Sequence, residues 1–168
     1  ELFFKRYNNI ELSKLRQKLN IPLSAIVILY VGRLMKEKGV KELLATYTEI
    51  LAEYKIDKLY LVYLGYGPLL EELKQIVSRA GLKTVKFVDF VPHKQLPKYY
   101  QMADIFVSFS YHDVWGYTIA EAAASGLPII TTEAVASAKN FVINNFNGFI
   151  NPPGDINALK LSLVQLIK

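Results

Sequence analysis

Two acidic residues stand in one stretch of the chain, SFSYHDVWGYTIAEAAASGLPIITT at residues 108–132. Asp113 comes shortly before a Trp-Gly pair, and Glu121 lies in an alanine-rich run, with seven residues between the two acids. Carboxylates accept hydrogen bonds from hydroxyl groups, so these two could hold two different sugar rings. The alternative is a surface acid in a loop and a solvated acid on a helix. The apolar setting TIAEAAASG around Glu121 favours a position near a crevice.

Two basic residues occur in the segment GRLMKEKG, residues 32–39. Gly32 directly follows an apolar run and lets the backbone turn sharply. The guanidinium fork of Arg33 and the point charge of Lys38 could together neutralise a diphosphate. Taken singly, each is also what an ordinary solvated loop contains, so the hypothesis depends on their standing at the same edge of a sheet.

The segment GYGP, residues 65–68, resembles the start of a dinucleotide-binding fingerprint. Leu70 stands where the third glycine of that fingerprint belongs, and the segment follows the second apolar run rather than the first. We therefore exclude a nicotinamide site. We interpret Gly65 and Gly67 as a tight turn whose backbone approaches a ligand.

Histidines and cysteines offer little further chemistry. His93 follows a proline and is expected to be a surface residue, whereas His112 adjoins Asp113 and stays a secondary candidate for catalysis. The chain has no cysteine, which excludes disulfides, thiolate zinc sites and cysteine nucleophiles. This composition is compatible with a reducing cytoplasm, where we expect the protein to work.

Length and composition indicate one globular domain. A chain of 168 residues with 52% hydrophobic residues can bury a substantial core, and it has no apolar run long enough to span a membrane. The opening residues ELFFKRYNNIELSK show no signal peptide, and without an initiator methionine the chain resembles a piece of something longer. The formal charge is +5 with scattered lysines, so we expect a solvated basic surface and no nucleic-acid partner.

Short apolar runs alternate with amphipathic stretches, a pattern typical of βαβ units. The sequence therefore predicts an α/β fold with a doubly wound, Rossmann-like parallel sheet. The expected strands are residues 25–31, 59–64, 85–91, 104–110 and 127–131. The expected helices are residues 40–54, 68–80 with Pro68 in the first position, 94–103 with Pro97 in the first turn, 117–125, and a last helix capped by Asp155.

The candidate residues all follow the ends of expected strands. In such sheets ligands bind outside the carboxyl ends of the strands, at the point where the strand order reverses. Gly32 and Arg33 follow the first strand, Gly65 to Pro68 follow the second, and Asp113 to Gly116 follow the fourth. The free N–H groups of the helix that begins near Tyr117 would add a phosphate site at the same crevice.

Four segments in this order, GRLMKEKG, LGYGP, HDVWGYTIAEAAASGLPII and NGFINPPGD, resemble the C-terminal, donor-binding domain of family-4 (group 1) glycosyltransferases of the GT-B fold. The family carries a Glu-x7-Glu motif, which here reads Asp113-x7-Glu121. The resemblance implies that Arg33 and Lys38 contact the donor diphosphate, that Glu121 binds the ribose hydroxyls, and that Asp113 contacts the transferred sugar. It also implies a retaining reaction without a metal or other cofactor. The remaining donor-binding residues it implies are Gly32, Gly65, Gly67, Trp115 and the backbone amides of Gly116, Tyr117, Thr118 and Ile119.

The resemblance also implies a domain organisation. Residues 1–24 would be the end of an interdomain linker and residues 25–168 the nucleotide-sugar-binding domain, with the N-terminal acceptor-binding domain absent. The expected function is sugar transfer to a saccharide or lipid-linked acceptor in polysaccharide, lipopolysaccharide or glycolipid synthesis, in a full-length protein that works in the cytoplasm or at the inner face of the membrane. The isolated domain is expected to be inactive.

Two departures from the family pattern leave alternatives open. Asp113 is one methylene shorter than the usual glutamate, which keeps a non-catalytic nucleotide-sugar-binding module as an alternative. A GT-B-like sugar-nucleotide epimerase is a further alternative, although the Arg, Lys and acid-x7-Glu set fits a transferase better. Lys139 and Asn140 stand where many relatives have an acidic residue, so the role of that loop is open.

Overall fold

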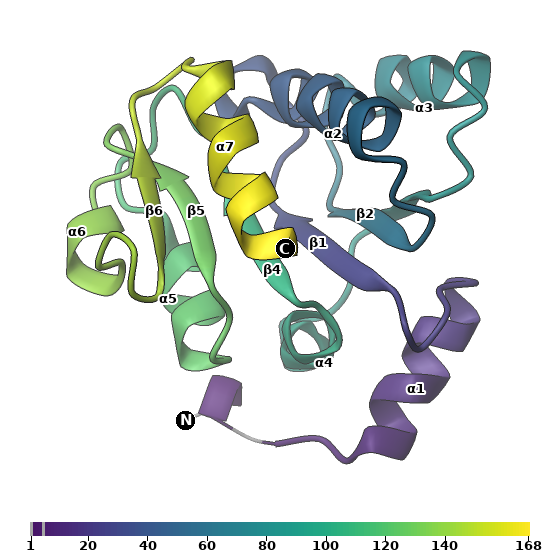
Figure 1. The fold of residues 1–168 in the computed structure, drawn as a ribbon. Helices are drawn as coiled ribbons and strands as arrows, with labels where there is room; N and C mark the ends of the chain where they lie inside the picture. Colours follow the sequence, from purple (N-terminus) through teal and green to yellow (C-terminus); the bar gives the residue numbers. More distant parts are fainter. Residues whose placement is uncertain (1, 5) are drawn as a thin grey trace.

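A computed structural model of the protein describes residues 2–4 and 6–168. Within those residues the strands form one six-stranded parallel sheet in the order β3-β2-β1-β4-β5-β6 (Figure 1). The strands are β1 (Ile26–Val31), β2 (Leu59–Leu64), β3 (Val85–Val88), β4 (Ile105–Ser108), β5 (Ile129–Thr132) and β6 (Gly148–Asn151).

Helices cover both faces of the sheet, which confirms the doubly wound architecture. One core lies under α2 (Val40–Tyr54), α3 (Leu70–Arg79) and α7 (Ile156–Ile167). The other lies under α1 (Asn9–Lys18), α4 (Leu96–Met102), α5 (Tyr117–Ala124) and α6 (Ala138–Phe141). Three short 3₁₀ helices complete the described elements: η1 (Leu2–Phe4), η2 (Lys36–Lys38) and η3 (His93–Gln95).

The apolar runs become central strands because each residue has a core to enter on either face. In β1, Val27, Leu29 and Val31 belong to one core cluster, whereas Ile28 and Tyr30 belong to the other. Successive side chains of a strand point to opposite faces, so a strand covered on both sides has to be apolar throughout. This is why β1 and β2 follow the predicted ranges closely.

Several expected boundaries need correction. The third and fourth strands end at Val88 and Ser108, and β6 was not predicted at all. Helix α3 begins at Leu70, so Pro68 lies outside it. Pro97 does lie in the first turn of α4, and the Asp155 carboxylate accepts a hydrogen bond from the Ala158 N–H at 2.9 Å, as predicted.

Residues 1–24, the expected linker, contain a helix. Its N-cap Asn8 accepts a hydrogen bond from the backbone N–H of Glu11, and Glu11 reaches back to the Asn8 N–H. Helix α1 packs against α4, and Arg16 donates to the Met102 carbonyl at 2.9 Å. The segment therefore rests on the domain, and its role as a linker stays a prediction.

The strand order reverses between β1 and β4. The chain runs outward through β2 and β3 and then returns to pair β4 with the other edge of β1, where Ile28 faces Ile105. The connections that leave β1 and β4 therefore diverge at their carboxyl ends and open a crevice between them.

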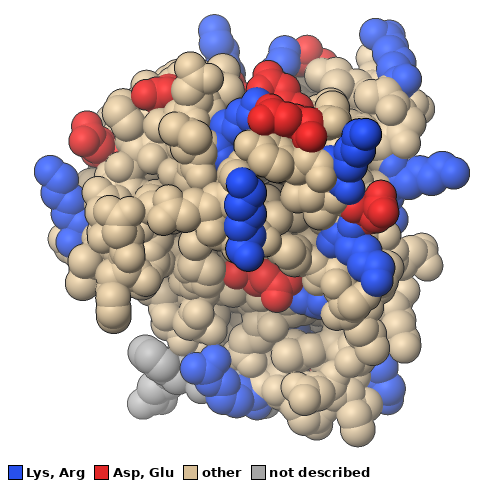
Figure 2. All heavy atoms as spheres, viewed as in Figure 1, with Lys and Arg blue, Asp and Glu red and all other residues tan. Residues whose placement is uncertain are grey.

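Two predictions from the composition, a surface with scattered basic residues and no membrane-spanning helix, can be compared with the structure. On the face shown in Figure 2, lysine and arginine side chains are spread among acidic and uncharged residues, without one large basic block. In the described part of the chain, no helix is both long and apolar enough to cross a bilayer.

Candidate functional site

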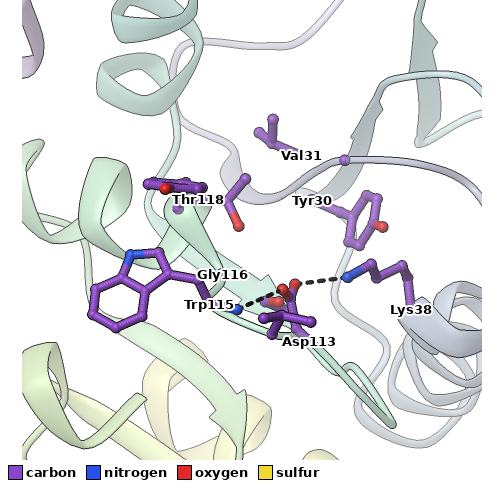
Figure 3. Close-up of a pocket in the computed structure, with 11 residues that line it drawn as sticks. Tyr30, Val31, Lys38, Asp113, Trp115, Gly116 and Thr118 are labelled. Atoms are coloured by element: carbon purple, nitrogen blue, oxygen red, sulfur yellow. Dashed lines mark hydrogen bonds and ion pairs between the residues drawn. The ribbon is translucent and has the colours of Figure 1, made fainter. Parts of the chain in front are cut away.

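A cavity of about 440 Å³ lies at the crevice between β1 and β4 (Figure 3). Its walls come from the end of β1, the loop after it, the end of β4, and the loop that leads into α5. A volume of this size suits a small-molecule ligand. The lining residues are Tyr30, Val31, Gly32, Lys38, Ser108, Asp113, Val114, Trp115, Gly116, Tyr117 and Thr118.

An ion pair lies in the wall of this cavity. Lys38 Nζ donates to Asp113 Oδ2 at 2.7 Å, and the two side chains are 23% and 21% exposed. The other carboxylate oxygen accepts from the Trp115 backbone N–H at 3.3 Å. Figure 3 shows Lys38 and Asp113 pointing toward one another, with the Trp115 ring turned away from them. The structure thus brings together a predicted phosphate-binding cation and the predicted sugar-contacting acid.

The two loops that carry this ion pair are joined through their backbones. Gly39 ends η2 with φ at 63°, and a Cβ at that position would lie 2.1 Å from the Phe109 carbonyl oxygen. The Tyr111 N–H donates to the Glu37 carbonyl at 2.8 Å. Only a residue without a side chain fits this contact, so Lys38 is held against the segment that follows β4.

The cavity also meets the start of α5. Gly116 is the N-cap with φ at 78°, and it has no side chain with which to cap the helix. The first N–H groups of an α-helix have no acceptor within the helix, and Tyr117 and Thr118 line the cavity at this end. The Ile119 N–H already donates to the Gly116 carbonyl at 3.0 Å, and the Ile119 side chain is buried in the core.

Glu121 lies on α5 outside this cavity. Its side chain is 17% exposed, and Oε2 accepts a hydrogen bond from the Tyr100 hydroxyl at 2.8 Å. His93 was expected at the surface, and its side chain is indeed 65% exposed. It also faces an acid, because its Nε2 lies 3.5 Å from Oε1 of Glu121. Burial raises the pKa of Tyr100 well above its ordinary value, and the Glu121 charge adds to this, so Tyr100 stays a neutral donor.

A second cavity of about 200 Å³ adjoins the first, and Val31 and Gly32 line both. Arg33 is exposed and lines this second cavity rather than the first. Gly65 is also in its wall; with φ at 143°, its Cβ position would lie 2.0 Å from the Gly32 carbonyl oxygen, which brings the ends of β1 and β2 together. The other lining residues are Leu64, Tyr66, Phe90, Val91 and Leu96.

Other sequence candidates fall at the margins of these cavities. Gly67 packs against the Leu34 backbone, with its Cβ position 2.4 Å from the Leu34 carbonyl oxygen, and lines neither cavity. His112 is exposed and does not line the first cavity despite its position next to Asp113.

The polar site residues that were not predicted include Tyr30, Ser108 and Tyr100. Tyr30 and Ser108 are the last or nearly last residues of β1 and β4, so the rule for strand ends could have identified them. The Tyr30 hydroxyl donates to the Arg33 carbonyl at 2.8 Å, and burial together with the Asp113 charge raises its pKa. Tyr100 is an apolar-face residue of α4, and nothing in the sequence pattern marks its partner.

A parallel sheet in this strand order, with a charged cavity at its switch point, defines a Rossmann-like α/β domain. The family described as "Glycosyl transferases group 1" matches residues 12–168, and the chain belongs to this family. Its fold is that of one domain of a GT-B glycosyltransferase, as the sequence motifs predicted.

The curated proteins that this chain resembles are longer than the chain itself. It is 33% identical over 120 residues to an alpha-monoglucosyldiacylglycerol synthase of Streptococcus pneumoniae, an alignment that covers 71% of this chain and 27% of the relative. The chain covers 27% to 38% of the length of the curated relatives it matches.

Solved structures agree with this placement. The C-terminal domain of the group 1 family protein LpcC from Francisella tularensis matches with a TM-score of 0.82 and 28% identity, over 99% of this chain and 85% of that one. Anabaena HepE in complex with UDP-glucose matches with a TM-score of 0.83 and 24% identity, over 100% of this chain and 46% of that one. At 24% identity, the similarity to HepE is evidence for the fold alone.

Proposed function

We propose that this chain is the donor-binding domain of a retaining glycosyltransferase that moves a hexose from a nucleotide-diphosphate sugar to an acceptor. The observation that carries the proposal is the placement of Lys38 and the start of α5 on one cavity at the switch point of the sheet. An ammonium group and free helix N–H groups are what a diphosphate needs.

The cavity walls suggest how the donor lies. The diphosphate would sit between Lys38 and the N–H groups of Tyr117 and Thr118, with Arg33 at the adjoining edge. Asp113 would then accept hydrogen bonds from the sugar hydroxyls. Asp113 Oδ2 lies 2.7 Å from Lys38 Nζ, so a bound diphosphate would share this lysine with the carboxylate.

The second cavity supplies a place for the remaining half of the donor. Its walls are mostly apolar and include Tyr66 and Phe90, which suits the flat ring of a nucleobase. Glu121 stands on the α4 side of the crevice beside η3, and Leu96, which follows η3, lines the second cavity. We therefore assign the ribose hydroxyls to Glu121, between the base and the diphosphate.

Relatives and neighbours support the substrate class. One relative is named as a glucosyldiacylglycerol synthase, and one solved neighbour was crystallised with UDP-glucose. We propose a nucleotide sugar as donor, a lipid-linked or saccharide acceptor held by an N-terminal domain of a longer chain, and a place in the cytoplasm or at the inner face of the membrane. Independence from a metal or other cofactor stays a prediction.

Replacing Lys38 with alanine is expected to weaken nucleotide binding about 10- to 100-fold, because a charge-assisted bond contributes roughly 1.5–3 kcal/mol. The loss also leaves Asp113 unneutralised next to the phosphates. Thermal-shift screening with UDP, GDP and ADP identifies the nucleotide, and calorimetry then measures its dissociation constant. Lys36→Ala is the matched control, because Lys36 belongs to the same short helix but is exposed and lines no part of the cavity. Equal affinities for Lys38→Ala and the control would contradict the phosphate assignment.

The two acids should separate in function. Glu121→Gln is expected to weaken binding of the bare nucleoside diphosphate, because the ribose is present with or without the sugar. Asp113→Asn should leave that binding intact or slightly tighter, since it frees Lys38 from its ion pair, and should impair transfer by the full-length enzyme. Calorimetry and a product assay test the two arms. Identical behaviour of the two variants would show that the division is wrong.

A further inference from the structure

Tyr100 holds one oxygen of the Glu121 carboxylate in a fixed place. Its hydroxyl donates to Oε2 at 2.8 Å, and the tyrosine is completely buried. The ring packs between Phe106 and Phe3, with centroid distances of 5.6 and 5.7 Å. A hydroxyl on so confined a ring has little freedom, so the carboxylate that accepts from it is oriented by the core.

The choice of partner distinguishes Tyr100 from other buried tyrosines. Tyr47 donates to the Leu59 carbonyl and Tyr63 to the Val40 carbonyl, each at 2.7 Å. A backbone carbonyl is enough to satisfy a buried phenol. Tyr100 instead holds a carboxylate that is mostly removed from water, and in the described residues no lysine or arginine lies within ion-pair distance of Glu121. Such an arrangement has a desolvation cost that simple satisfaction of the hydroxyl does not require.

The second oxygen of the Glu121 carboxylate, Oε1, faces an exposed side chain instead of a buried one. Oε1 lies 3.5 Å from Nε2 of His93, whose side chain is 65% exposed and sits on the short helix η3. An exposed imidazole at that distance can be displaced by a ligand hydroxyl. One oxygen is therefore held by a rigid donor, whereas the other faces the exposed imidazole of His93.

We propose that Tyr100 is a positioning residue that fixes Oε2 of Glu121 and thereby presents Oε1 to the ribose hydroxyls of the donor. The inference rests on the proposed function, since it assumes that Glu121 contacts ribose. It makes Tyr100, a core residue of α4, a determinant of the selection of ribonucleotides over deoxyribonucleotides. His93 covers the same oxygen until the ligand arrives.

The test is a selectivity ratio. Calorimetry gives the dissociation constants of the nucleoside diphosphate chosen by the screen and of its 2′-deoxy form, and their ratio reports recognition of the ribose hydroxyl. The wild-type chain is expected to favour the ribonucleotide about 10- to 100-fold. Tyr100→Phe keeps the packed ring and removes only the hydroxyl, and it should lower this ratio by about 3- to 10-fold.

Tyr63→Phe is the matched control, because it also removes a fully buried hydroxyl but one that is bonded to a backbone carbonyl. It should leave the ratio unchanged, and thermal unfolding of both variants verifies that they fold. A high wild-type ratio that Tyr100→Phe leaves intact would overturn the inference while the proposed function stands. A wild-type ratio near one would instead remove the ribose role of Glu121, and the inference with it.

Discussion

These 168 residues alone are expected to bind a nucleoside diphosphate and to transfer no sugar at a useful rate. The cavity at the switch point, Lys38, the start of α5 and Glu121 all lie within the chain, so binding needs nothing else. Transfer also needs an acceptor held against the donor, and that positioning can supply about 7–11 kcal/mol of the barrier. The chain covers only 27% to 38% of the length of its curated relatives, which is consistent with an acceptor domain elsewhere in a longer protein.

The measurement pairs calorimetry with a sensitive product assay on the same preparation. Adding the full-length protein to the comparison should restore turnover at the same donor concentration. Rapid transfer by the 168-residue chain would show that the site contains its own acceptor subsite. Binding by neither preparation would show that the cavity has been assigned to the wrong ligand.

Replacing Gly39 with alanine is expected to lower the free energy of unfolding by about 2–5 kcal/mol. A left-handed backbone costs an L-residue roughly 1–2 kcal/mol, and forcing a methyl group into a packed contact adds about 1–3 kcal/mol. At Gly39, φ is 63° and the added Cβ would lie 2.1 Å from the Phe109 carbonyl oxygen. Because that atom belongs to the backbone, the loop of Lys38 has to move away, and nucleotide affinity should fall with stability.

Gly81→Ala is the control that separates the two costs. Gly81 has nearly the same backbone conformation, with φ at 64°, but a Cβ there meets nothing within 4 Å. It should lose only about 1–2 kcal/mol in urea unfolding and keep its nucleotide affinity. Equal losses for the two variants would show that the contact between Gly39 and Phe109 contributes nothing.

The central part of the fold could be predicted because its strands are apolar on both faces. Residues 26–31 and 59–64 are apolar throughout, so in a parallel sheet they are expected to form central strands that are buried on both faces. Strand β6 at the edge was missed because GFIN is short, contains a glycine and is only partly buried. Helix α1 was missed because it has no fully buried residue and therefore shows no clear apolar stripe.

The site was predicted at the level of segments rather than of contacts. The rule for strand ends placed Lys38 and Asp113 at the same edge of the sheet. The two residues are 75 positions apart in the sequence, however, and no local pattern predicts that their side chains form an ion pair. The same holds for Glu121, whose partners come from α4 and η3. Arg33 and Gly65 share the second cavity because β1 and β2 are neighbours. Strands that follow one another in sequence usually lie side by side in a sheet, but this tendency does not specify which pairs do so.

The close approach of Gly39 to Phe109 has a consequence for protein engineering. Residues 36–39 and the segment from 109 to 116 behave as one cassette, because the Tyr111 N–H bond to Glu37 and the glycine contact tie them together. If only residues 109–116 were transplanted into a related scaffold, Asp113 would no longer be positioned against Lys38. A chimera that carries both segments, with the glycine retained, would transfer the pair of Lys38 and Asp113 intact.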